Sequence, residues 1–135
     1  MKSLVLLGRI LFSLIFVISG FGHFKSQTVQ YAVSHHVPLA ELLVPVAGIM
    51  AILGGLSIMT GFKAKFGACL IILFLIPVTL FMHNFWAVED PMQHQIQHTM
   101  FLKNTSMLGG AFLIAYFGAG PMSFDNKNKK EIPVT

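Results

Sequence analysis

The chain has 135 residues, of which 55% are hydrophobic and only 10% are charged. Soluble domains carry about 25% charged residues, so a mostly water-exposed surface is excluded. The length allows one domain. The formal net charge of +4 could in principle attract nucleic acid. However, the basic residues near the C-terminus form only a short tail after an apolar segment, so nucleic-acid binding is not predicted.

Four apolar segments each have about 20 residues, the length that crosses a bilayer as a helix. They cover residues 4–24, 39–60, 66–85 and 99–117. We therefore predict an all-α fold, an antiparallel bundle of four transmembrane helices over residues 1–125. Residues 126–135 are predicted to form a polar, disordered cytoplasmic tail. The first segment is too long for a signal-peptide core and no A-x-A cleavage site follows it, so we expect it to be retained.

Histidines and basic residues gather at opposite ends of these segments. The histidines lie in or near the first and third connections: His23, His35, His36, His83, His94 and His98. Most lysines flank the other ends: Lys2, Lys63, Lys65, Lys127, Lys129 and Lys130. Because Lys and Arg are in excess in cytoplasmic loops, both termini and the 61–65 hairpin are predicted to be cytoplasmic.

The two connections on the outer side have different expected structures. Residues 25–38 are too polar to span a membrane and are expected to hold a short interfacial helix. Asp90 followed by Pro91 is a good helix start, with a capping side chain and then proline at the first helical position. The last long helix is therefore expected to begin outside the membrane, and its first turns would carry His94 and His98.

Arg9 lies roughly one to two turns inside the first segment. Its side chain could extend to the cytoplasmic headgroups while its stem stays in the apolar layer. Alternatively, it could form a structural ion pair with Asp125, which follows the fourth segment on the same side. Both interpretations stay open.

Polar residues near the outer ends of the predicted helices form the candidate ligand site. They are Glu41, His83, Asn84, Lys103 and Asn104, with Trp86 as an interfacial aromatic residue. Ionisable residues at membrane depth are costly and usually face a bundle interior or a wet cavity. Glu41 would balance the charge of Lys103, and His83 could bind a ligand carbonyl or relay a proton. The alternative is a polar network that only fixes the helices in register.

His94 and His98 are the weak candidates for a metal site. They are four residues apart, which places both rings on one helix face at a spacing that suits two ligands of one ion. A third ligand could come from His35, His36, Glu89 or His83. No HExxH motif or second spaced pair is present, so no metal is predicted and solvated histidines are the stronger interpretation. Cys69 is the single cysteine, which excludes an internal disulfide and a CxxC pair.

Several short motifs together resemble the DoxX family of small bacterial membrane proteins. They are GRIL (8–11), SGFGHF (19–24), FMHNFW (81–86), FLKN (101–104), GG (109–110) and GAGPMSFD (118–125). His23 stands where many members have lysine, and Phe124 where leucine is usual. The resemblance implies a four-helix protein of the bacterial inner membrane. Some relatives are named as subunits of a thiosulfate:quinone oxidoreductase, and others are linked to membrane redox complexes.

The leading functional hypothesis is a non-catalytic or co-catalytic subunit of a membrane redox system. A quinone or another small amphipathic ligand would occupy a polar pocket near the outer leaflet, with apolar walls from Phe81, Phe85, Trp86 and Phe101. No haem or flavin motif is present, and whether the chain is an enzyme stays open. The lipid bilayer and redox proteins are the expected partners, and an oligomer is compatible. The alternatives are a membrane scaffold or assembly protein and a small transporter, which would require an oligomer.

Overall fold

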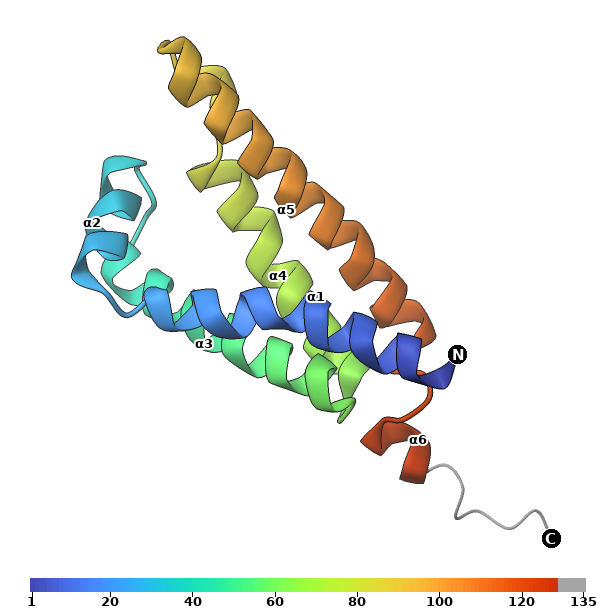
Figure 1. The fold of residues 1–135 in the computed structure, drawn as a ribbon. Coiled ribbons are helices and arrows are strands. Elements are labelled where there is room, and N and C mark those ends of the chain that lie inside the picture. The colour runs from blue at the N-terminus through green and yellow to red at the C-terminus, as the bar shows by residue number, and fades with distance from the viewer. Residues whose placement is uncertain (129–135) are drawn as a thin grey trace, which may run out of the picture.

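The computed structural model describes residues 1–128, and within them every regular element is helical. The elements are α1 (Lys2–Gly22), α2 (Ser26–Ser34), α3 (Ala40–Thr60), α4 (Ala64–Met82), the 3₁₀ helix η1 (Phe85–Ala87), α5 (Pro91–Phe117) and α6 (Phe124–Asn128). Figure 1 shows the four long helices forming the body of the molecule, with α2 at one end and α6 at the other. The all-α prediction is confirmed for the described residues.

Local sequence signals explain where several helices begin and end. The Asp90 side chain accepts a hydrogen bond from the Gln93 N–H at 2.9 Å, so the predicted start of α5 is confirmed. Gly61 ends α3 with φ 71°, a conformation that glycine adopts without steric penalty. The tight turn that follows makes α3 and α4 antiparallel neighbours, as expected. The short helix predicted in residues 25–38 is also present, as α2.

Three helices are long and apolar enough to cross a membrane: α1, α3 and the α4–η1 segment. Most of their large side chains are exposed, which is the arrangement that lipid contact requires. The predicted fourth crossing is not confirmed. α5 has 27 residues and is long enough, but polar residues such as Lys103, Asn104 and Thr105 interrupt its apolar sequence. The structure therefore establishes a helical fold with three candidate membrane spans in the described residues, and it does not establish a bundle of four crossings.

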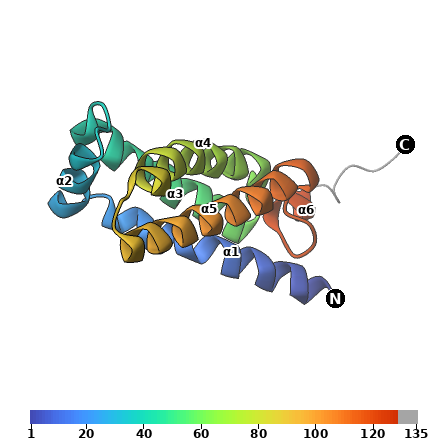
Figure 2. The ribbon, with the colours of Figure 1, turned by 90° about the horizontal axis from the view of Figure 1, so that it is seen from above.

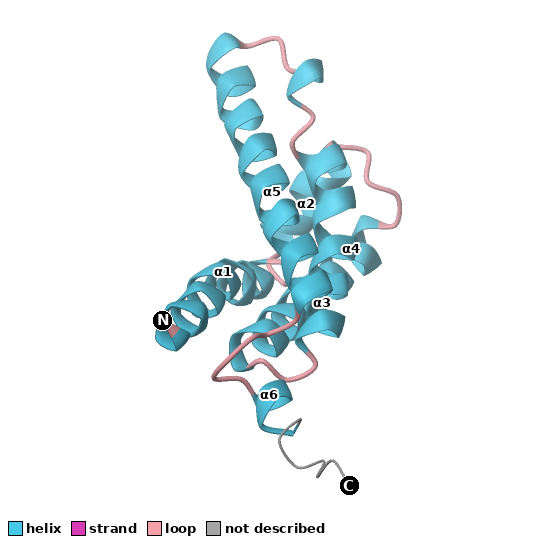
Figure 3. Cartoon of the chain, turned by 90° about the vertical axis from the view of Figure 1, so that its right-hand side faces the viewer, coloured by secondary structure: helices cyan, strands magenta, loops and turns pink. Residues whose placement is uncertain are grey.

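The long helices pack in chain order, α1 on α3, α3 on α4 and α4 on α5. The α1–α3 pair crosses the α4–α5 pair, and the two pairs converge toward the end that holds the N-terminus and α6 (Figures 1 and 2). At the other end they diverge, and α2 lies beside the opening. The first turns of α5 extend beyond α4 and pack against η1 (Figure 3). The fold is thus a wedge rather than a closed bundle.

The core fills the narrow part of this wedge. Its fully buried members come from all four long helices: Phe16, Ala51, Ile58, Ala68, Ile71, Phe74, Leu75 and Ala111. Phe16 meets Phe74 edge to face, with ring centroids 6.3 Å apart. This contact joins α1 to α4 where the helix pairs cross.

Small residues let α1 and α3 approach backbone to backbone. A Cβ atom on Gly20 would lie 2.9 Å from the carbonyl oxygen of Gly48, and one on Gly48 would lie 2.7 Å from that of Gly20. Real Cβ atoms essentially never lie this close to a carbonyl oxygen, so both positions require glycine, which has only a hydrogen atom in place of a side chain. Gly22, two residues further along α1, has open space around its Cα. The same helices also approach closely at Gly55, where a Cβ atom would lie 3.2 Å from the carbonyl oxygen of Ser13.

The C-terminal segment is only partly described. Ser123 immediately precedes α6, and its hydroxyl accepts a hydrogen bond from the Asn126 N–H at 3.2 Å. Residues 126–128, expected as the start of the tail, are therefore helical. The remainder of that tail, residues 129–135, lies outside the described residues.

We expect Gly20→Ala to lower the free energy of unfolding in detergent by about 1–3 kcal/mol, the usual cost of overpacking. The added methyl group would force α1 away from the Gly48 carbonyl. Gly22→Ala is the matched control, since it makes the same change in the same helix where space is open. Denaturant titration followed by circular dichroism measures both variants. Equal stabilities would contradict the proposed contact.

Candidate functional site

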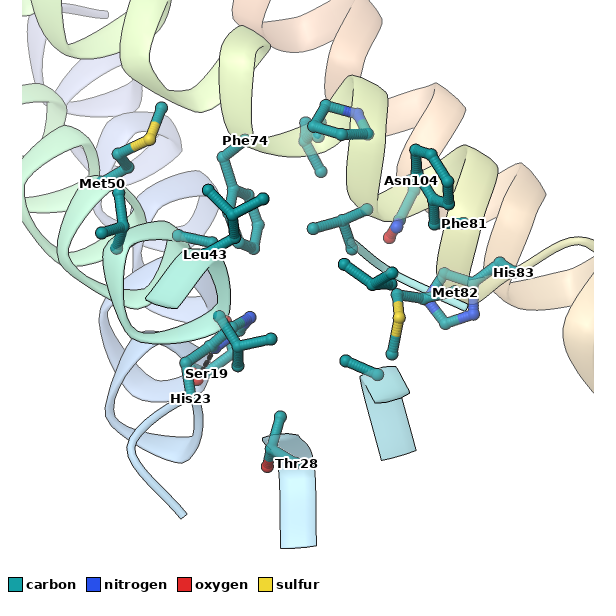
Figure 4. Close-up of a pocket in the computed structure, with 18 of the residues that line it drawn as sticks. Ser19, His23, Thr28, Leu43, Met50, Phe74, Phe81, Met82, His83 and Asn104 are labelled. Carbon is teal, nitrogen blue, oxygen red and sulfur yellow. Dashed lines mark hydrogen bonds between the residues drawn. The ribbon is translucent and has the colours of Figure 1, made fainter. Parts of the chain in front are cut away.

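A cavity of about 430 Å³ opens in the wide part of the wedge. Its walls come from α1, α3, α4 and α5, and α2 closes one side of it (Figure 4). The volume is within the range of about 300–1,000 Å³ found for small-molecule sites. The wall is mostly apolar, and Phe74, Pro77, Phe81 and Met107 all contribute to it.

Asn104 is the polar residue most deeply buried in this cavity. Its exposed fraction is 5%, and Figure 4 shows its amide directed into the open space. Within residues 1–128 its side chain has no hydrogen-bond partner. Its amide atoms are not enclosed, since Arg9 Nε is the only enclosed polar side-chain atom without a partner in the described residues, so the amide can bind water or a ligand in the cavity. The cavity therefore presents a free amide to whatever occupies it.

His83 and Lys103, two of the candidate ligand residues from the sequence, also line the cavity. His83 follows the last residue of α4, and its Nδ1 lies 2.8 Å from Oε1 of Gln97 on α5. Gln97 Nε2 in turn donates to the Tyr31 hydroxyl on α2 at 3.4 Å. This chain of hydrogen bonds connects three helices at the rim of the cavity.

His23 is a cavity residue that the sequence analysis treated only as a topology marker. It follows α1, its Nδ1 lies 2.9 Å from the Ser19 carbonyl oxygen, and its ring meets the edge of Phe74 at 5.4 Å. Its Cβ packs over Gly48, so the close approach of α1 and α3 places it at the cavity wall. The i, i+4 spacing of Ser19 and His23 in the sequence is compatible with a hydrogen bond along one helix, but it does not indicate which neighbouring helix the ring faces.

The other candidate ligand residues lie outside the cavity. Glu41 is exposed in the first turn of α3 and forms no ion pair with Lys103 among the described residues. The Lys103 ammonium instead contacts Met100 Sδ at 3.2 Å. Asn84 precedes η1, and Trp86 is 59% exposed. Glu41, Asn84 and Trp86 are near the same end of the molecule as the cavity, but they are not among the residues that line it.

Aromatic packing explains where Trp86 and the histidine pair lie. Phe85 contacts Trp86 and Phe101, with ring centroids 5.3 Å away in each case. His94 and His98 stack at 6.4 Å from each other and also pack beside Phe85. Of the four expected aromatic wall residues, Phe81 alone lines the cavity. No group of three metal-binding side chains is found in the described part of the chain.

Arg9 and Asp125 both lie at the opposite end of the molecule, where each side chain forms hydrogen bonds with backbone groups. Arg9 is 4% exposed and donates to the carbonyl oxygens of Ala119, Pro121 and Met122 at 2.6, 3.1 and 2.7 Å. The Asp125 carboxylate accepts hydrogen bonds from the N–H groups of Lys63 and Ala64 at 2.7 and 2.9 Å, at the start of α4. No direct ion pair between the two is formed in the described structure. Together they attach residues 119–125 to α1 and α4.

The comparisons with known proteins agree with the family resemblance. The DoxX family model matches residues 4–84. The chain is 31% identical over 128 residues to inner membrane protein YphA of Escherichia coli, covering 92% of this chain and 89% of that protein. It is 30% identical to inner membrane protein YqjF of the same organism, covering 93% of each.

A more distant relative comes from yeast. The ER-derived vesicles protein ERV29 of Saccharomyces cerevisiae is 28% identical over 81 residues, which is 60% of this chain and 26% of the yeast protein. No solved structure matches the chain with significance.

Replacing Arg9 with methionine should lower the free energy of unfolding by about 3 kcal/mol, since hydrogen bonds from a charged donor contribute about 1.5–3 kcal/mol. The loss would free the 119–122 segment from α1. Lys2→Met is the control, because it removes a positive charge from an exposed position on the same helix. Chemical denaturation in detergent checks the difference, and unchanged stability of the Arg9 variant would refute this anchoring role.

Proposed function

Because this chain belongs to the DoxX family, we propose that it is an inner-membrane protein that binds a small amphipathic ligand, such as a quinone, in the cavity beneath α2. It would act as a subunit or accessory component of a membrane redox system. The observation that carries this proposal is Asn104, a buried residue whose amide faces the cavity and has no hydrogen-bond partner among residues 1–128.

The cavity chemistry supports a ligand with a flat apolar body and a few polar atoms. Phe74, Phe81 and Met107 offer apolar and aromatic contacts. The Asn104 amide and the Lys103 ammonium can both donate hydrogen bonds, and quinone oxygens accept them. His83 lies on the same side of the cavity, with one ring nitrogen held by Gln97 and the other left for a ligand.

The same residues support a binding role more than an independent catalytic one. Cys69, the single thiol of the chain, is not among the residues that line the cavity. The polar groups that do line it can orient a ligand and exchange protons, but they do not carry electrons. Electrons would then pass between the ligand and a partner protein, in keeping with an accessory subunit.

A purely structural role is the second candidate. It is favoured by the His83–Gln97–Tyr31 hydrogen bonds, which join α4, α5 and α2. In that case the polar groups would set helix register, and the protein would hold partner proteins together. The two candidates differ in what they predict for Asn104, because a scaffold needs no ligand.

Ligand binding predicts that Asn104→Leu weakens quinone binding at least about tenfold, equivalent to about 1.4 kcal/mol. The same substitution should raise the unfolding temperature of the ligand-free protein, because it replaces an amide on a mostly apolar wall with an apolar side chain. Asn84→Leu is the matched control, since Asn84 lies outside the cavity. Binding is measured with duroquinone on the purified full chain in nanodiscs.

A result in which both asparagine variants bind duroquinone as the original chain does would reject this site. If neither variant nor the original chain binds it, the scaffold alternative is favoured. Mass spectrometry of lipidic ligands and proteins that copurify from the source membrane then tests the two candidates directly.

The proposed orientation has both termini in the cytoplasm and α5 as the fourth crossing. The N-terminus and α6 lie at the same end of the molecule, which supports an even number of crossings (Figure 1). In a Cys69→Ala background, His35→Cys and His94→Cys should react with an impermeant thiol reagent added to intact cells, whereas Asn128→Cys should not. The opposite labelling pattern would reverse the orientation. Labelling of all three positions would rule out the fourth crossing.

A further inference from the structure

We infer that the cavity favours the hydroxyl-bearing, reduced form of its ligand, a quinol, over the carbonyl-only quinone, and that His23 is the residue that sets this preference. The inference rests on the proposed function, because it assumes that the cavity is a ligand site. It adds the chemical form of the ligand and a selectivity residue on α1.

The hydrogen bond between His23 and Ser19 determines which ring nitrogen carries the proton. A carbonyl oxygen only accepts hydrogen bonds, so Nδ1, at 2.9 Å from the Ser19 oxygen, must carry the hydrogen. In the neutral ring, Nε2 is then a lone-pair acceptor. Figure 4 shows the ring at the cavity wall formed by α1, and within residues 1–128 its Nε2 has no partner.

Packing holds this acceptor in position. The Cβ of His23 rests over Gly48, where any side chain would displace it. The ring contacts the edge of Phe74 with centroids 5.4 Å apart. Rotation of the ring would break both this contact and the Ser19 bond, so the Nε2 lone pair is a preorganised feature of the wall.

The opposite wall has complementary hydrogen-bonding groups. The Lys103 ammonium only donates, while the Asn104 amide can donate and accept. A ligand that reaches both walls must therefore donate to His23, and it can accept a hydrogen bond from Lys103 or Asn104. A quinol hydroxyl does both, whereas a quinone oxygen only accepts and would bring a lone pair toward the His23 lone pair.

The preference follows from the asymmetry between a formed and a missing hydrogen bond. A quinone bound against this wall would displace water from His23 Nε2 without offering it a donor, and losing that hydrogen bond is more unfavourable than a new one is favourable. We expect quinol to bind about tenfold more tightly than quinone. For a two-electron couple, that difference raises the midpoint potential of the bound ligand by about 30 mV.

The test compares three probes on the full chain in nanodiscs, with empty nanodiscs correcting for partition into lipid. They are duroquinone, duroquinol kept reduced by dithionite, and the dimethyl ether of duroquinol, which has the same body but no hydroxyl donor. We expect duroquinol to bind about tenfold more tightly than either of the other two. Equal affinities of quinol and ether would overturn the inference even if all three bind at the cavity.

Two variants assign the preference to His23. His23→Phe keeps a ring against Phe74 but removes the acceptor, and the quinol-to-quinone affinity ratio should fall to about one. His23→Lys replaces the acceptor with a donor, and the ratio should reverse. If the quinol-to-quinone affinity ratio is unchanged in both variants, His23 does not set the preference. Should both variants fail to fold, the ratio and the ether comparison on the original chain still decide whether a hydroxyl donor is required.

The outcomes separate this inference from the proposed function. If the original chain binds no probe, or if Asn104→Leu leaves the binding of every probe unchanged, the proposed function fails and the inference fails with it. If binding depends on Asn104 but the quinone binds as tightly as the quinol, the site is supported and the preference is overturned.

Discussion

The contact between Gly20 and Gly48 is the constraint on which the outer half of this fold depends. Each glycine lies against the other's carbonyl oxygen at a distance that no side chain permits. The contact brings α1 against α3, which is the most extensive helix pair in the fold. It also brings the His23 side chain over Gly48, at the cavity wall. A membrane supplies no hydrophobic drive between helices, so such close packing is what holds this pair together.

The two ends of the wedge are built for different tasks. At the narrow end, Arg9 and Asp125 bind backbone groups of the connecting segments, and Nε of Arg9 is the only guanidinium nitrogen without a partner in the described residues. At the wide end, Asn104 and the free nitrogen of His23 have no protein partner among the described residues. Buried polar groups that are satisfied add rigidity, whereas groups left free are available to a ligand. This contrast locates the candidate site.

The polar character of α5 explains both the unconfirmed fourth crossing and the site. Lys103 and Asn104 lower the hydropathy of this helix, and both are among the residues that line the cavity. The exposed fraction of Asn104 is only 5%. The sequence thus identified His83, Lys103 and Asn104 as residues near one cavity. It also selected Glu41, Asn84 and Trp86, because position along a helix does not give its rotation toward a neighbour.

The sequence by itself determined the helical class, the helix boundaries marked by Asp90, Pro91 and Gly61, and the family resemblance. These features depend on local composition, capping and short motifs. Only the tertiary structure decided that Arg9 and Asp125 bind separate backbone groups, and that His23 joins Asn104 at one cavity. Those outcomes depend on how helices distant in the chain rotate and cross, which is set by packing between them rather than by any one segment.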